Sequence, residues 1–83
     1  MPVYFFNLRN GSGLLEDFEG QELADLEAAR AEGTKAARAL IADEVMHGRL
    51  DLRAAIEIMD DGGRLLLAIP FEEAIAIETG SAG

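Results

Sequence analysis

The sequence predicts a two-layer α+β fold, in which one long helix covers one face of a four-stranded, mostly antiparallel sheet in the order β-β-α-β-β. Residues 3–9 alternate with the strand period of two, and residues 25–47 form an alanine-rich helical pattern. Residues 54–69 contain two more apolar strands around a glycine-containing turn. We also expect a short C-terminal helical turn.

The first hairpin is predicted by the alternation that follows Pro2. Its first strand places Tyr4, Phe6 and Leu8 on one face and Val3, Phe5, Asn7 and Arg9 on the other. Residues 10–13 read Asn-Gly-Ser-Gly, which suits a tight turn because Asn and Gly accept positive φ angles. The return strand is acidic and interrupted by Gly20, so we expect it to be short, bent or edge-like, with Phe18 as its inward-pointing anchor.

The long helix is predicted between two end signals. Asp25 has the residue type of an N-cap, and Gly48 has that of a C-terminal stop. The expected buried stripe consists mainly of small side chains, with Ile41 at its margin: Leu26, Ala29, Gly33, Ala36, Ala37 and Leu40. Gly33 lowers helix propensity by about 1 kcal/mol relative to Ala, which close packing on the sheet would offset; a local bend is the alternative.

The second hairpin comprises residues 54–59 and 64–69 around Asp60-Asp61-Gly62-Gly63. Its later strand is apolar on both faces, which favours a central position or a covered outer face. Pro70 ends this strand, and residues 71–75 have the spacing of a short helical turn.

Length and composition describe one globular domain over residues 1–78, followed by a flexible tail at residues 79–83. The 83 residues are 49% hydrophobic and carry a formal net charge of -9. Because a phosphate backbone is bound through Lys and Arg, this charge argues against nucleic acid as a partner. The sequence has no cysteine, no export signal and no apolar run of membrane length, so we expect a cytoplasmic protein with no membrane partner.

A resemblance to a known family is carried by two motifs, Tyr4-Phe5-Phe6-x-Leu8-Arg9-x-Gly11 and Asp17-x-Glu19-Gly20-x-Glu22-Leu23-x-Asp25-Leu26-x-x-Ala29. They resemble short bacterial proteins, common in rhizobia and their relatives, that are catalogued as a domain of unknown function. Ile56-Glu57-Ile58-x-Asp60 and Pro70-Phe71 are similar to the same family. The resemblance spans Pro2 to about Ala74 and implies no active site.

A second similarity is to the HicB-type antitoxin half-domain. There, a hairpin, an acidic glycine-containing stretch and a helix opening of the form Asp-Leu-Glu-Ala-Ala occur in the same order, and residues 25–29 have this form here. The resemblance implies a small basic protein as partner, to which a chain of charge -9 is complementary. We find no DNA-binding segment of the kind appended to such antitoxins.

Residues with catalytic or metal-binding chemistry are sparse. The single histidine, His47, follows Asp43 by four residues and Glu44 by three, a spacing that allows the three side chains to approach a divalent metal. The structural alternative is an interaction of His47 with the helix dipole. No nucleophile has a base at mechanistic spacing, so we predict no catalytic residue, no metal site and no cofactor.

An interaction surface is therefore the main functional prediction. The candidate residues form one group on the outer face of the sheet and one on the back of the helix: Val3, Phe5 and Leu66, and Ala28, Ala31, Ala39, Ala42 and Met46. Phe5 and Leu66 require cover from the C-terminal segment or from a second chain.

We expect a non-catalytic module for protein interaction or oligomerisation, with a homodimer as one form of this hypothesis. The two alternatives are an antitoxin-like binder of a small basic protein and a small metal- or ligand-dependent enzyme centred on His47.

Overall fold

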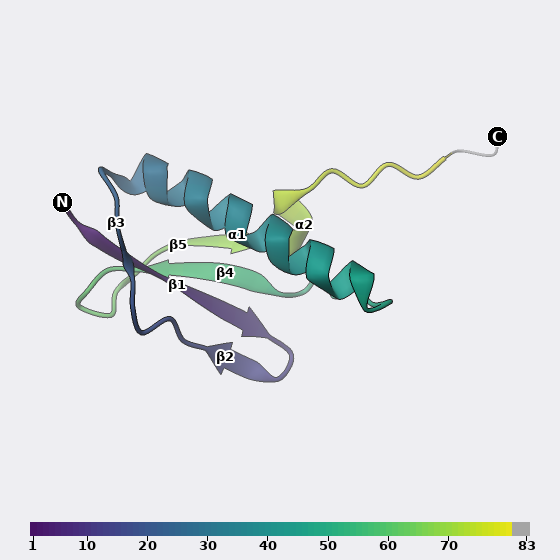
Figure 1. The fold of residues 1–83 in the computed structure, drawn as a ribbon, viewed down its shortest axis with the longest axis horizontal. Coiled ribbons are helices and arrows are strands. Elements are labelled where there is room, and N and C mark those ends of the chain that lie inside the picture. The colour runs from purple at the N-terminus through teal and green to yellow at the C-terminus, as the bar shows by residue number, and fades with distance from the viewer. Residues whose placement is uncertain (81–83) are drawn as a thin grey trace.

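The computed structural model describes residues 1–80, which form an antiparallel sheet with a long helix across one face (Figure 1). The strands are β1 (Val3–Asn10), β2 (Gly13–Leu15), β3 (Gln21–Glu22), β4 (Ala55–Met59) and β5 (Leu65–Pro70), and the helices are α1 (Leu26–Met46) and α2 (Phe71–Ala74). The sheet order is β2-β1-β4-β5, and β3 also pairs with β1. The predicted fold class is confirmed.

Two further sequence predictions concern the C-terminal tail at residues 79–83 and the absence of a membrane-spanning segment. Of the predicted tail, residues 81–83 lie outside the described part of the chain. Within that part, no helix is both long enough and apolar enough to cross a membrane.

The first hairpin has the predicted turn. Asn10 pairs with Gly13, and the Asn10 side-chain oxygen accepts the Ser12 N–H at 2.8 Å. Gly13 has a φ of 128°, which a residue with a side chain rarely adopts.

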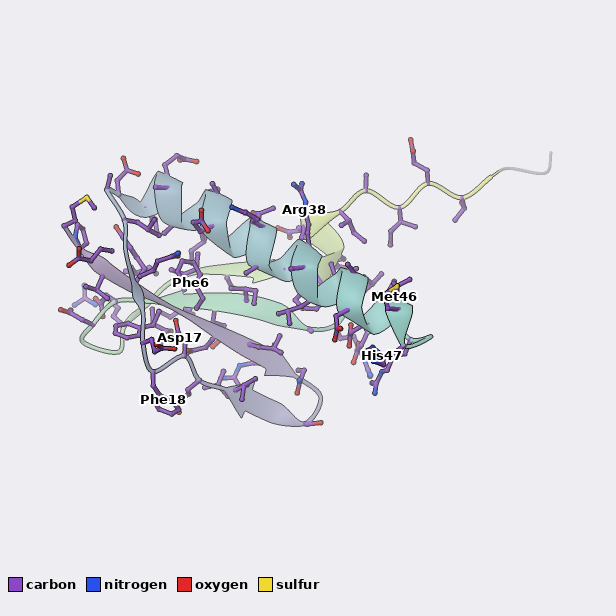
Figure 2. All side chains as sticks on the ribbon, in the orientation of Figure 1. Phe6, Asp17, Phe18, Arg38, Met46 and His47 are labelled. Carbon is purple, nitrogen blue, oxygen red and sulfur yellow. The ribbon has the colours of Figure 1, made fainter. Side chains whose placement is uncertain are left out.

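The return strand is short and lies at the edge of the sheet, as predicted, but it is also divided in two. β2 pairs with the C-terminal part of β1, β3 pairs with Val3 and Tyr4, and residues 16–20 connect them. The prediction that Phe18 points inward is wrong, because its side chain is 83% exposed (Figure 2). Asp17 points toward β1 instead, and neighbouring residues of an extended chain point in opposite directions.

Helix α1 begins and ends at the predicted residues. The Asp25 side chain accepts the Ala28 N–H at 2.9 Å. At the other end Gly48 has a φ of 79°, and the Arg49 N–H donates to the Glu44 carbonyl oxygen at 3.0 Å. This is the glycine-dependent C-terminal cap that the sequence indicates.

The buried face of α1 contains small residues at a four-residue spacing. It consists of Ala29, Gly33, Ala37 and Ile41. Ile41 is thus central rather than marginal. A Cβ atom at Gly33 would lie 2.7 Å from Ile69 Cδ1 and 3.0 Å from Ile58 Cδ1, so close approach to β4 and β5 explains this glycine. The helix continues through Gly33 without interruption.

The second hairpin forms as predicted, but the central position favoured for its later strand is wrong. β5 pairs with β4 alone and is the edge strand of the sheet. Its inner face is buried because α2 folds back against α1: Phe71 and Ala74 are each 1% exposed, and Arg38 Nε donates to the Ala74 carbonyl oxygen at 2.7 Å (Figure 2). The C-terminal segment therefore packs on the helix side of the sheet and does not cover the outer face.

Candidate functional site

The outer face of the sheet is the face turned away from α1. Directly opposed residues of antiparallel strands lie on the same face. The registers therefore place the following residues on it: Phe5, Asn7, Arg9, Ala55, Glu57, Met59, Leu65, Ala68 and Pro70. Arg9 Nε lies 2.7 Å from Glu57 Oε2, and this hydrogen bond together with the charge of Glu57 raises the pKa of Arg9.

The β1 part of the outer face is covered by the chain itself. Residues 16–20 cross over it, and the Asp17 N–H donates to Asn7 Oδ1 at 2.9 Å. A Cβ atom at Gly20 would lie 2.8 Å from both Phe5 Cε2 and Val3 Cγ1. Two of the predicted interaction residues, Val3 and Phe5, are half-buried under this segment.

Asp17 fixes the crossing segment to β1. Its carboxylate accepts the Phe6 N–H at 3.1 Å, the Glu19 N–H at 3.0 Å and the Gly20 N–H at 3.2 Å. Burial by itself raises the pKa of this carboxyl, but the three backbone donors outweigh it and the pKa of Asp17 lies below its usual value. In the gap between β2 and β3, this side chain replaces a strand carbonyl as the acceptor for β1.

The Asp17→Asn variant is expected to lose about 1–2 kcal/mol of the free energy of unfolding at neutral pH. Asn has nearly the same shape, but it replaces one acceptor oxygen with a donor that faces backbone N–H groups. Urea denaturation followed by circular dichroism measures the loss. The matched Asp61→Asn variant changes an exposed carboxylate in a turn and should leave the stability nearly unchanged.

The difference in the free energy of unfolding between the wild type and Asp17→Asn is expected to disappear in acid. Since the folded-state pKa of Asp17 is lowered, its contribution is fully present above the unfolded value of about 3.9 and is lost as the pH falls through the folded pKa. Repeating the denaturation at successively lower pH should make the wild type and Asp17→Asn converge. A difference that persists unchanged in acid would contradict this role for the charge.

Among residues 1–80, no strand pairs with the outer edge of β5, which is therefore the free edge of the sheet. The Phe71 N–H donates to the Ala54 carbonyl oxygen at 2.9 Å. Along an antiparallel strand, every second residue directs its backbone N–H and carbonyl groups toward the same neighbouring strand. The N–H and carbonyl groups of Ile69 are therefore directed toward β4, whereas those of Ala68 are directed away from the sheet. β5 reads Leu-Leu-Leu-Ala-Ile-Pro and contains no charged residue.

The opposite edge of the sheet is formed by the short strands β2 and β3. Four acidic residues lie on or between them: Glu16, Asp17, Glu19 and Glu22. Short, charged edge strands disfavour pairing with another chain. The two edges of this sheet thus differ in their capacity to accept a further strand.

The predicted residues on the back of α1 lie on the side of the molecule opposite the outer sheet face. Ala31, Ala39 and Ala42 are exposed and Met46 is 83% exposed, whereas Ala28 is half-buried. Leu66, predicted for the outer face, lies at the irregular register of β5 and packs partly against the core. The structure does not bring the two predicted groups together.

A cavity of about 470 Å³ lies between the C-terminal end of α1, the first hairpin turn and the loop before β4. Its lining includes Asn10, Ser12, Asp43, Glu44, Arg49, Asp51 and Arg53. Arg53 pairs with Asp51, with Nε 2.9 Å from Oδ1, and hydrogen bonds from its side chain and backbone lower the pKa of Asp51. Among the described residues of this lining there is no histidine or cysteine, and so no pairing of a nucleophile with an imidazole base.

His47 does not form the metal group considered from the sequence. Its Nδ1 lies 2.8 Å from the Asp43 carbonyl oxygen, and Glu44 instead accepts the Asp51 N–H at 3.4 Å. Over residues 1–80, no group of three or more His, Cys, Asp or Glu side chains is arranged to hold a metal ion. His47 is the C-cap residue of α1.

Three outer-face residues, Met59, Leu65 and Ala68, were not among the predicted interaction residues. Strand alternation placed Met59 opposite the buried isoleucines of its strand, which was a usable signal. The positions of Leu65 and Ala68 depend on the sheet order and on the irregular register after Ile58. No local pattern contains that information.

The fold and its surfaces define a small α+β protein whose sheet, within residues 1–80, has one uncharged free edge and a partly uncovered outer face. The sequence profile of a family described as a domain of unknown function, DUF6894, matches residues 3–72. The chain therefore belongs to this family, as its motifs implied. Comparisons with curated proteins and with solved structures find no match.

Proposed function

We propose that this protein is a non-catalytic interaction module that forms a homodimer by antiparallel pairing of β5 with β5 of a second copy. The observation that carries the proposal is the uncharged free edge of Leu65–Pro70. Unpaired backbone groups on an edge strand are a template for another strand, and such pairing would extend the sheet across both copies.

Charge favours this edge for a contact between two copies. Each chain carries -9, so most surfaces would bring carboxylates together. β5 has no charge, Arg64 precedes it, and Glu72 follows it. Both Arg64 and Glu72 lie four residues from Ala68. A two-fold axis at Ala68 would therefore bring the Arg64 end of each strand toward the Glu72 end of the other.

Accessibility and symmetry support the same alignment. Ala68 is exposed, and its outward N–H would donate to the Ala68 carbonyl oxygen of the second copy, while its own carbonyl oxygen would accept the N–H of that residue. Contacts that are the same on both copies are what a two-fold dimer requires.

The Ala68→Glu variant is expected to raise the dimer dissociation constant at least about tenfold, since it places two like charges next to each other at the axis. Sedimentation equilibrium over a range of concentrations measures the constant. The control is Ala39→Glu, which makes the same change at an exposed position on the back of α1 and should leave the constant unchanged.

Arg64→Glu should also weaken the dimer, and the double variant Arg64→Glu, Glu72→Arg should restore much of the loss. A wild-type protein that stays monomeric at high concentration would overturn the proposal. Dissociation by Ala39→Glu but not by Ala68→Glu would overturn it in favour of a dimer through the back of α1.

A further inference from the structure

A second cavity, of about 360 Å³, lies on the outer face between the crossing segment 16–20 and the β4–β5 turn. Its apolar lining consists of Phe5 and Met59, which are opposed in the sheet, and of Leu14, which is 40% exposed. This outer-face groove is separate from the backbone edge of β5. An apolar groove next to a sheet surface is suited to a side chain with an apolar stem.

The rim of the groove is acidic. Four carboxylates line it, Glu16, Asp17, Asp60 and Asp61, and no Lys or Arg of the described chain does. Two of the four have backbone partners: Asp17 holds the crossing segment, and Asp60 Oδ1 accepts the Arg64 N–H at 2.8 Å. Glu16 and Asp61 are exposed and have no such bond among the described residues. They are the carboxylates available to a ligand.

Asn7 adds a polar group at the base of the groove. The residue is 6% exposed and lines the cavity. Its side-chain oxygen already accepts the Asp17 N–H, so the group that remains is the amide NH₂, a hydrogen-bond donor. A donor below an acidic rim matches a polypeptide, which has carbonyl acceptors along its backbone.

We propose that the outer-face groove binds an arginine side chain of a basic partner polypeptide. The aliphatic stem would lie along Met59 and Leu14, and the guanidinium would stack on the ring of Phe5. The head group would pair with Glu16 and Asp61, since planar guanidinium and carboxylate groups match in geometry. The charge of -9 would draw a basic partner toward this chain.

A second copy of this chain is a poorer occupant. Four of its seven bases are already paired with its own carboxylates: Arg9, Arg30, Lys35 and Arg53. Arg38 is bonded to the Ala74 carbonyl oxygen. A separate basic partner supplies arginine without breaking these bonds.

The proposal is tested by titrating the ¹⁵N-labelled full chain with a blocked tri-arginine peptide and recording amide chemical shifts. We expect saturable shifts at the Asn7 side-chain NH₂ and at the backbone amides of Phe5, Met59 and Asp61. The double variant Glu16→Gln, Asp61→Asn should bind about three- to tenfold more weakly, because it removes both free carboxylates.

The matched control is the double variant Glu73→Gln, Glu78→Gln, which removes the same charge from two exposed positions of the C-terminal segment that lie outside both the groove lining and the proposed dimer contact. It should bind the peptide within about twofold of the wild type. Equal weakening by both double variants would overturn the proposal, since the attraction would then come from net charge. It would also be overturned by shifts at the β5 edge alone or by no saturable shift. The dispersion of the amide spectra verifies that each variant is folded.

Discussion

The Phe71→Ala variant is expected to lose about 3–5 kcal/mol of the free energy of unfolding. Phe71 is 1% exposed and is one of the two largest fully buried side chains. It belongs to the core under α1, so its removal leaves a cavity that neighbouring side chains fill only in part. The loss is a large part of the total for a small domain, which is about 5–15 kcal/mol.

Urea denaturation of the wild type and the variant, followed by far-ultraviolet circular dichroism, measures this loss. Phe18→Ala is a matched control, because it removes the same ring from a position that is 83% exposed. Its stability should lie within about 0.5 kcal/mol of the wild type. Similar losses in both variants would contradict the burial of Phe71 and the exposure of Phe18.

Gly33→Leu is expected to destabilise the protein by about 3 kcal/mol, because α1 crosses the sheet at this residue without room for a side chain. Even a Cβ atom would lie 2.7 Å from Ile69 Cδ1. Ile58 and Ile69 are 0% and 5% exposed, so they have little space into which to move. Gly33→Ala should lose much less, since a gain of about 1 kcal/mol in helix propensity offsets part of the strain.

Thermal unfolding by differential scanning calorimetry, together with urea denaturation, measures both Gly33 variants. Ala31→Leu on the exposed side of the same helix is the control and should leave the stability nearly unchanged. If Gly33→Leu were as stable as Ala31→Leu, the close approach of α1 to the strands would be wrong. Stabilisation by Gly33→Ala close to the full propensity gain would also contradict it.

The position of the candidate surfaces was only partly predictable. Assigning Val3 and Phe5 to the outer face was correct, because strand alternation is a local property. The cover over Phe5 was expected from the C-terminal segment or a second chain, but residues 16–20 supply it, because it depends on contact between that segment and β1. No structural role was assigned to Asp17 from the sequence, yet its carboxylate accepts the N–H of Phe6, which lies 11 residues away along the chain. The periodic pattern of residue types along a strand or helix does not indicate a hydrogen bond between residues so far apart in the sequence.

Local signals were sufficient for the order of the main elements, for the ends of α1 and for the two hairpin turns. Asp25 caps α1, Gly48 ends it, and residues 10–13 and 60–63 form the two hairpin turns. Each of these features depends on the backbone conformation and hydrogen bonds of a few neighbouring residues, which residue type controls directly.

The arrangement of these elements follows from packing between distant parts of the chain. β5 was expected to be central or to have a covered outer face because it is apolar on both faces, but it lies at the edge with its outer face open, and α1 and α2 cover only the inner face. The free edge and the outer-face groove exist only once β1 lies between the crossing segment and β4. The apolar side chains of a strand show only that they are suited to burial. The elements that pack next to the strand in the fold determine which of its faces is buried.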